Sequence, residues 1–164
     1  MIYIIMGVSG CGKSALGAIL SEKDRLPWLF RLHEVIERER RSCSDALVAC
    51  SALKRLYRQI LLHGSKALDS SSGPDGDVLP PTRPDVCFLF LHGDYDLIQQ
   101  RMAARRGHYM KADLLRSQFD ALEPPSEEEN ALPLDVSRSM TDMATEVLEH
   151  SVRPDLPYLA NVVE

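Results

Sequence analysis

The sequence predicts an α/β fold in which helices cover both faces of a parallel β-sheet. Four short, mostly apolar runs have the length and composition of buried strands, at residues 2–6, 46–50, 86–91 and 132–136. The segments between them carry apolar residues at intervals of three and four, which indicates amphipathic helices. A glycine-rich loop follows the first run directly. Sheets of this kind bind ligands at the carboxyl ends of their strands, so motifs that follow a strand are candidate site residues.

The predicted helices alternate with these strands. The helix at about 26–41 has Pro27 in its first turn and places Leu29, Leu32 and Ile36 on one face. The other helices are predicted at about 13–20, after strand 46–50, at about 95–105, 113–122 and 140–148. Residues 63–84 are rich in Ser, Gly, Asp and Pro and predict an exposed, flexible loop.

The 164 residues fit one domain, residues 1–164. A net charge of −5 argues against nucleic acid or an anionic membrane as a partner. The run 2–6 lacks a basic leader and a cleavage site, so we expect a strand rather than a signal peptide, and no apolar stretch is long enough to span a bilayer. The four cysteines have no metal-binding or CxxC spacing, which predicts a reduced, cytoplasmic protein.

The glycine-rich loop matches the phosphate-binding pattern G-x-x-x-x-G-K-[ST] in full. Its residues are Gly7, Val8, Ser9, Gly10, Cys11, Gly12, Lys13 and Ser14. Successive backbone N–H groups of such a loop point at phosphate oxygens. Lys13 would bridge the β- and γ-phosphates as a catalytic residue, and Ser14 would ligate Mg²⁺. The strand-to-helix context favours this interpretation over a chance glycine turn, so the sequence predicts ATP and Mg²⁺ as cofactors.

Beyond this loop, four segments together resemble the gluconate kinases of the P-loop kinase fold. They are residues 6–14, 24–29, 49–58 and 107–125. The Cys-Ser-Ala-Leu-Lys string at 50–54 and the Ser-Gln-Phe-x-x-Leu-Glu string at 117–123 are more specific than the phosphate loop. The resemblance implies an ATP-dependent kinase with gluconate as its substrate, which supplies 6-phosphogluconate to carbohydrate metabolism. We expect a homodimer as its assembly.

Three polar residues that follow strand 46–50 are candidate substrate-binding residues: Ser51, Lys54 and Arg58. Lys54 and Arg58 are four positions apart, which would place them on one helical face where they could attract a carboxylate. The alternative interpretation is a solvated basic face.

The resemblance makes residues 101–122 a helical lid that closes over ATP. Cations gather around its glycine: Arg101, Arg105, Arg106, His108 and Lys111. Arg101 and Arg105 are candidate catalytic residues that would neutralise charge on the transferring phosphoryl group, and His108 is a candidate substrate-binding residue. The alternative is a solvated, charged helix end. Trp28 shapes the substrate side by resemblance, or else packs between helices.

One part of the family pattern is missing. The resemblance implies a second strand, an Asp-x-Asp element and a His-Pro between the first helix and Asp24, with an aspartate as base for the attacking hydroxyl. No Asp-x-Asp occurs between Lys13 and Trp28, no His-Pro occurs anywhere in the chain, and a full helix, strand and loop would need about thirty more residues there. We therefore expect the sheet to lack an edge strand and strand 46–50 to be an unpaired edge. Asp24 and Glu34 are candidate replacements for the base, and alternative splicing and a flawed gene model are both open explanations.

Two other functions remain open on sequence grounds. One is a kinase of the same fold that acts on another small acid or on a nucleotide. The other is a truncated chain that binds ATP without kinase activity, alone or in association with full-length subunits. The missing Asp-x-Asp favours the second, because loss of the substrate wall and the base impairs transfer.

Overall fold

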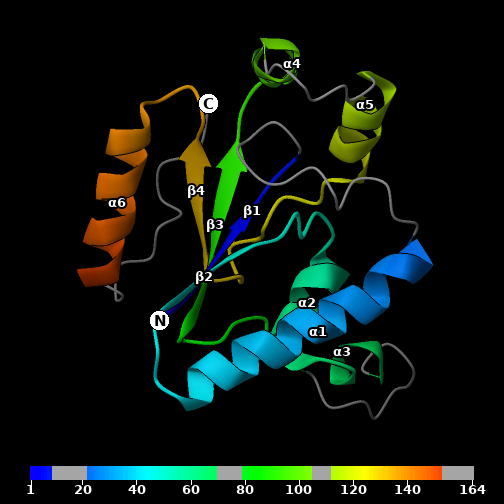
Figure 1. The fold of residues 1–164 in the computed structure, drawn as a ribbon, viewed down its shortest axis with the longest axis vertical. Helices are drawn as coiled ribbons and strands as arrows, with labels where there is room; N and C mark the ends of the chain where they lie inside the picture. Colours follow the sequence, from blue (N-terminus) through cyan, green and yellow to red (C-terminus); the bar gives the residue numbers. More distant parts are fainter. Residues whose placement is uncertain (9–21, 70–78, 105–111, 153–164) are drawn as a thin grey trace.

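The computed structural model describes residues 1–8, 22–69, 79–104 and 112–152 (Figure 1). Its strands are β1 (Ile2–Met6), β2 (Ala46–Ala49), β3 (Val86–His92) and β4 (Ala131–Asp135). They form one sheet in the order β2-β1-β3-β4, and each neighbouring pair is parallel. The predicted parallel sheet is confirmed, with each predicted strand end correct to within one residue.

Helices cover both faces of this sheet. They are α1 (Glu22–Arg41), α2 (Arg55–His63), α3 (Lys66–Asp69), α4 (Tyr95–Ala104), α5 (Ala112–Ala121) and α6 (Met140–Val152). Figure 1 shows α1 and α2 on one side of the sheet and α6 on the other, with α4 and α5 near the carboxyl ends of the strands. The α/β fold class is therefore confirmed. Residues 66–69 are helical, which differs from the loop predicted for 63–84, and the helix predicted at 13–20 lies outside the described residues.

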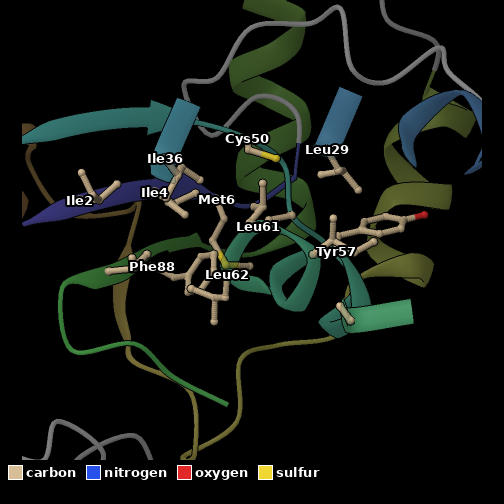
Figure 2. Packing of buried hydrophobic residues seen from close by; sticks show 14 of the residues in the cluster. Ile2, Ile4, Met6, Leu29, Ile36, Cys50, Tyr57, Leu61, Leu62 and Phe88 are labelled. Atoms are coloured by element: carbon tan, nitrogen blue, oxygen red, sulfur yellow. The ribbon is translucent and has the colours of Figure 1, made fainter. Parts of the chain in front are cut away.

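The larger core lies between the sheet and the helices α1 and α2. Alternate β1 residues Ile2, Ile4 and Met6 point to this side and are fully buried. They pack with Leu29 and Ile36 of α1, as the three- and four-residue spacing predicted, and with residues of α2 and β3 (Figure 2). Burial of each such side chain contributes about 1.5–3 kcal/mol, so this cluster fixes α1 and α2 against the sheet.

The other face of the sheet packs against α6. Here the intervening β1 residues, Tyr3 and Ile5, lie beside a cluster that includes Cys87, Leu132 and Met143. Both faces of β1 and β3 therefore carry apolar side chains, which explains why their sequences are continuously apolar rather than alternating. Among the described helices, none has the combination of length and apolarity needed to cross a bilayer.

Strand β2 is an edge of the sheet among the described strands, as predicted. It pairs with β1, and its residues alternate between half-buried and exposed. The prediction of a buried strand is therefore wrong for this segment. Leu47 is the register partner of Tyr3 on the α6 face, but α6 packs against β4 at the opposite end of the strand order, so Leu47 is 66% exposed.

A third apolar cluster lies at the carboxyl ends of the strands. It joins five buried residues from segments that are far apart in the sequence: Val8, Leu53, Ile98, Leu115 and Val136. These residues belong to the start of the phosphate loop, the segment between β2 and α2, the helices α4 and α5, and the segment after β4. The cluster therefore holds the candidate site segments together.

Candidate active site

Gly7 turns the chain at the carboxyl end of β1. Its φ angle is +134°, a conformation that residues with a side chain rarely adopt. A Cβ at this position would lie 2.3 Å from the carbonyl oxygen of Leu91. The Gly7 N–H donates to the carbonyl oxygen of Ser51 at 3.3 Å. The loop thus begins with a glycine that the packing requires, directly beside the segment that follows β2.

Val8 is the other described residue of the phosphate loop. Its side chain is buried in the cluster with Ile98 and Leu115, so its backbone is the part that can serve a nucleotide. The remaining predicted residues, from Ser9 through Lys13 to Ser14, lie outside the described part of the chain. Gly7 and Val8 fit the start of a phosphate-binding loop, because a tight glycine turn after a strand is the geometry that this loop needs.

The turn between β2 and α2, residues 50–54, has an unusual backbone. Ala52 has a φ of +43°, in the left-handed region that costs a non-glycine residue about 1–3 kcal/mol. Lys54 is the N-cap residue of α2, with extended backbone angles of −96° and 146°. Because Lys54 precedes the helix, it does not share a helical face with Arg58. The predicted basic pair is therefore not formed.

Arg58 lies in the protein interior instead of facing the cleft. Its side chain is fully buried and forms a two-pronged ion pair with Glu129, with Nε to Oε2 at 2.5 Å and Nη2 to Oε1 at 2.9 Å. Its Nη1 donates to the carbonyl oxygens of Ala52 and Glu123, each at 3.0 Å. This buried position contradicts both sequence interpretations of Arg58, the substrate ligand and the solvated basic face.

Glu123 completes the support of the same turn. Its N–H donates to the carbonyl oxygen of Leu53 at 2.8 Å. Its Oε2 accepts from the N–H of Arg55 at 2.7 Å, which caps α2 where Lys54 makes no side-chain cap. A carboxylate at this position also interacts favourably with the helix dipole. Glu123, Arg58 and Glu129 together hold the turn 50–54 in its strained conformation.

A small cavity of about 40 Å³ lies beside this turn. Its polar and aromatic lining residues are Arg25, Trp28, Ser51, Tyr57 and Gln118. They come from α1, the β2–α2 turn, α2 and α5. In Figure 2 the Tyr57 ring lies at the end of the buried cluster near Leu29, with its oxygen pointing away from the other labelled side chains. The structure thus brings the predicted residue Ser51 together with Trp28, and adds Arg25 and Gln118, to which sequence reasoning assigned no role.

Comparison with known proteins decides the family. A probable gluconokinase of Rattus norvegicus is 34% identical over 90% of this chain and 96% of its own length. The thermoresistant gluconokinase of Escherichia coli is 30% identical over 90% of this chain and 91% of its own. The chain belongs to the gluconokinase family. A scan against models of protein families gives no match.

Two solved structures support the gluconokinase fold. A sugar kinase of Janibacter sp. HTCC2649 superposes with a TM-score of 0.71 at 28% identity and covers 93% of this chain and 95% of its own. A gluconokinase of Sinorhizobium meliloti 1021 gives a TM-score of 0.67 at 29% identity, over 93% and 91% of the two chains. Family membership makes the protein an ATP-dependent carbohydrate kinase by class.

The alignment with the rat gluconokinase also shows a difference in length. It runs over 177 positions, whereas 90% of this 164-residue chain is about 148 residues. The relative therefore has about 30 more positions within the matched span. This difference is close to the length of about thirty residues expected for the missing strand and acidic loop.

The other predicted gluconokinase site residues are placed only in part. Arg101 is exposed in the last turn of α4, while Arg105 and His108 lie outside the described residues. Glu34 is exposed, lies 3.7 Å from Arg31, and does not line the cavity beside turn 50–54. The side chain of Asp24 also lies outside the described part. Neither carboxylate is therefore placed at the cavity as a base.

No group of three or more His, Cys, Asp or Glu side chains suited to a metal occurs in the part of the chain that the structure describes. The expected Mg²⁺ ligand, Ser14, is outside that part. At the carboxyl end of β4, the Ser137 N–H donates to Asp135 at 2.8 Å and lowers the pKa of that carboxyl group, with a smaller effect from His92. Asp135 is thus ionised at neutral pH, at the edge of the sheet where the site lies.

Proposed function

We propose that this chain transfers the γ-phosphoryl group of ATP to D-gluconate and releases 6-phospho-D-gluconate and ADP. The observation that carries the proposal is the hydrogen bond from Gly7 N–H to the Ser51 carbonyl oxygen. It joins the start of the phosphate loop to the turn that lines the cavity, so donor and acceptor segments adjoin. The gluconokinase relatives supply the identity of the acceptor.

The phosphate loop would bind the donor. Backbone N–H groups from Gly7 to Ser14 would surround the phosphates, and Lys13 would bridge the β- and γ-phosphates. Ser14 would hold Mg²⁺, which neutralises phosphate charge when it is bound. In this proposal Arg101 and Arg105 act from the lid on charge that develops at the transferring group. Catalysis then rests on positioning and charge stabilisation.

The acceptor would lie against the turn 50–54. Ser51 would contribute a polar group there, with Lys54 beside it at the end of the turn, and His108 would contact the substrate from the lid. Arg58 makes no direct contact in this proposal, because its guanidinium is committed to Glu129 and to backbone carbonyls. Its role is to position the turn. The gluconate O6 attacks the γ-phosphorus in line as the bond to the bridging oxygen of ADP breaks, and the hydroxyl proton passes to water.

The proposed setting is the cytoplasm, with a homodimer as the assembly. No disulfide joins the described cysteines, Cys43, Cys50 and Cys87, as a reducing compartment favours. Cys87 is fully buried, and burial raises the pKa of its thiol to about 11, so it is not a reactive thiolate. Sedimentation velocity of the purified chain at several concentrations tests the homodimer.

A coupled ADP-release assay tests the function. We expect ADP release that depends on both gluconate and MgATP, and its loss in Lys13→Ala. Turnover of another small acid or a nucleotide, without turnover of gluconate, would show that the chain is a kinase but that gluconate is not its acceptor. Analysis of the product by NMR then establishes which hydroxyl carries the phosphate.

Two observations favour a second candidate, an ATP-binding chain without transfer activity. The rat relative has about 30 positions that this chain lacks, and the 40 Å³ cavity is small beside the ~300–1,000 Å³ of typical ligand sites. ATP binding measured by calorimetry, together with no gluconate-dependent ADP release, supports this candidate. Gluconate turnover well above the Lys13→Ala background rejects it.

A further inference from the structure

The cavity beside turn 50–54 contains a cation that sequence reasoning did not consider. Arg25 lies in the first turns of α1 and lines this cavity with Trp28, Ser51 and Gln118. Its Nε is shielded from solvent and has no hydrogen-bond partner among the described residues. A guanidinium N–H that is buried without an acceptor carries a desolvation cost, which a ligand with suitable oxygens would remove.

The other cations expected at this position are oriented differently. Arg58 is fully buried and bound to Glu129. The Lys54 ammonium lies over the ring of Tyr57, 5.7 Å from its centroid. Arg25 is therefore the basic residue that the described structure places in the cavity lining.

The charge around Arg25 also indicates an anionic ligand. No Asp or Glu is among the described residues that line the cavity. The groove on the outer face of α1 is different, because Arg38 and Arg41 share it there with Glu34 and Glu37. A guanidinium in an acid-free, partly apolar cavity favours a carboxylate, since planar oxygen pairs match its donor geometry.

We propose that Arg25 binds the carboxylate of the acceptor and so selects a sugar acid over a neutral polyol. The inference rests on the proposed gluconate kinase function and identifies the residue that recognises the acid group. The small cavity suits the carboxylate end of gluconate, because a carboxylate group fits in a space that is too small for the whole six-carbon chain. Ser51 ties this cavity to Gly7, so an acceptor held by its carboxylate here lies beside the phosphate loop.

Steady-state kinetics of the full chain with Arg25→Gln test the proposal. We expect the KM for gluconate to rise about 10- to 100-fold, the range for a lost hydrogen bond between charged groups, while the KM for ATP is unchanged. Arg25→Lys keeps the charge without the planar fork, so it restores part of the affinity. The matched control is Arg31→Gln, also on α1, whose side chain is exposed and outside the cavity; we expect wild-type kinetics.

Competition by D-glucitol, which has a CH₂OH group in place of the carboxylate, separates recognition of the acid from a general structural effect. Its inhibition constant should be the same in the wild type and in Arg25→Gln, so that the preference for gluconate over glucitol falls with the gluconate affinity. An unchanged gluconate KM in Arg25→Gln, or an equal loss of both ligands, overturns the role of Arg25 while the kinase function stands. Absence of gluconate-dependent ADP release in the wild type overturns the proposed function, and the inference with it.

Discussion

Glu129 neutralises the charge of Arg58 in the interior, at 1% side-chain exposure for both residues. Glu129→Gln would leave a buried guanidinium without a counter-charge, which typically costs about 3–5 kcal/mol. We expect the free energy of unfolding, measured by urea titration, to fall by this amount. The turn 50–54 should loosen as well, because Arg58 also holds the carbonyl of Ala52.

The chain offers a matched control for this prediction. Arg55 of the same helix pairs with Glu128 of the same loop at 3.1 Å, but their side chains are 50% and 68% exposed. Solvent screens such a pair, so Arg55→Gln should cost less than about 1 kcal/mol. Equal, small losses for Glu129→Gln and Arg55→Gln would contradict a structural role for the buried pair.

His63 gives the fold a pH dependence of known sign. Burial, the largest cause, lowers the pKa of His63 below its ordinary value; the charge of Arg83 acts in the same direction, and the hydrogen bond to the Pro80 carbonyl opposes both. The unfolded chain therefore takes up the proton first as the pH falls below about 6.5. The stabilising contribution of His63 is complete above that pH and is lost as the pH falls toward the folded-state pKa.

Urea unfolding at several pH values between about 5 and 8 measures this contribution. We expect the free energy of unfolding of the wild type to fall as the pH is lowered. His63→Gln should show a smaller fall, because its amide takes up no proton. The amide also keeps a donor toward the Pro80 carbonyl. His150, whose pKa burial also lowers, accounts for a remaining slope of the same sign. An identical pH dependence in the variant and the wild type would refute the contribution of His63.

At the residue scale, local motifs were predictable and distant pairs were not. Gly7 could be assigned from a strand, a loop and a helix that follow one another directly. Arg58 could not, because its partner Glu129 is 71 positions away and no spacing in the sequence relates them. The helical pairing of Lys54 with Arg58 failed for a local reason: α2 begins one residue after Lys54.

At the scale of elements, apolar runs located the strands because burial on both faces leaves its own pattern in the sequence. The same reasoning gave the wrong burial for β2. Whether Leu47 is covered depends on the position of α6 along the sheet, and that position is a property of the tertiary packing. The cap of α2 was missed for a similar reason, since its acceptor is the distant Glu123.

Because Leu47 is exposed on an edge strand, we expect chains to associate through β2 at high concentration. An edge strand with an exposed apolar side chain favours pairing with further strands, and a lysine there opposes it. We expect Leu47→Lys to reduce light scattering from concentrated samples and to change the free energy of unfolding by less than about 0.5 kcal/mol. As a control, Leu132→Ala removes a fully buried strand residue and should cost about 2–5 kcal/mol. Unchanged scattering in Leu47→Lys would show that association uses another surface.

At the scale of the whole molecule, the edge position of β2 and the length difference from relatives have one explanation. The segment that the resemblance implies between Ser14 and Asp24 would supply a strand, and β2 is one of the two edge strands of the described sheet, β4 being the other. The same segment would add an acidic loop at the carboxyl end of the sheet, close to the cavity with Arg25 and Ser51. One missing segment would thus account for both the exposed edge and the small cavity.

Restoring the segment tests this explanation. We would insert the corresponding residues of the rat relative, about 30 positions, between Ser14 and Asp24. Because a positioned base contributes about 10²–10⁴-fold, we expect kcat/KM for gluconate in the ADP-release assay to rise by at least about 100-fold. A Gly/Ser insert of equal length is the control, since it restores chain length without the strand or the carboxylates. Equal rates for the original and the restored chain would mean that the gap does not impair catalysis and that groups already present, Arg25 among them, complete the acceptor site.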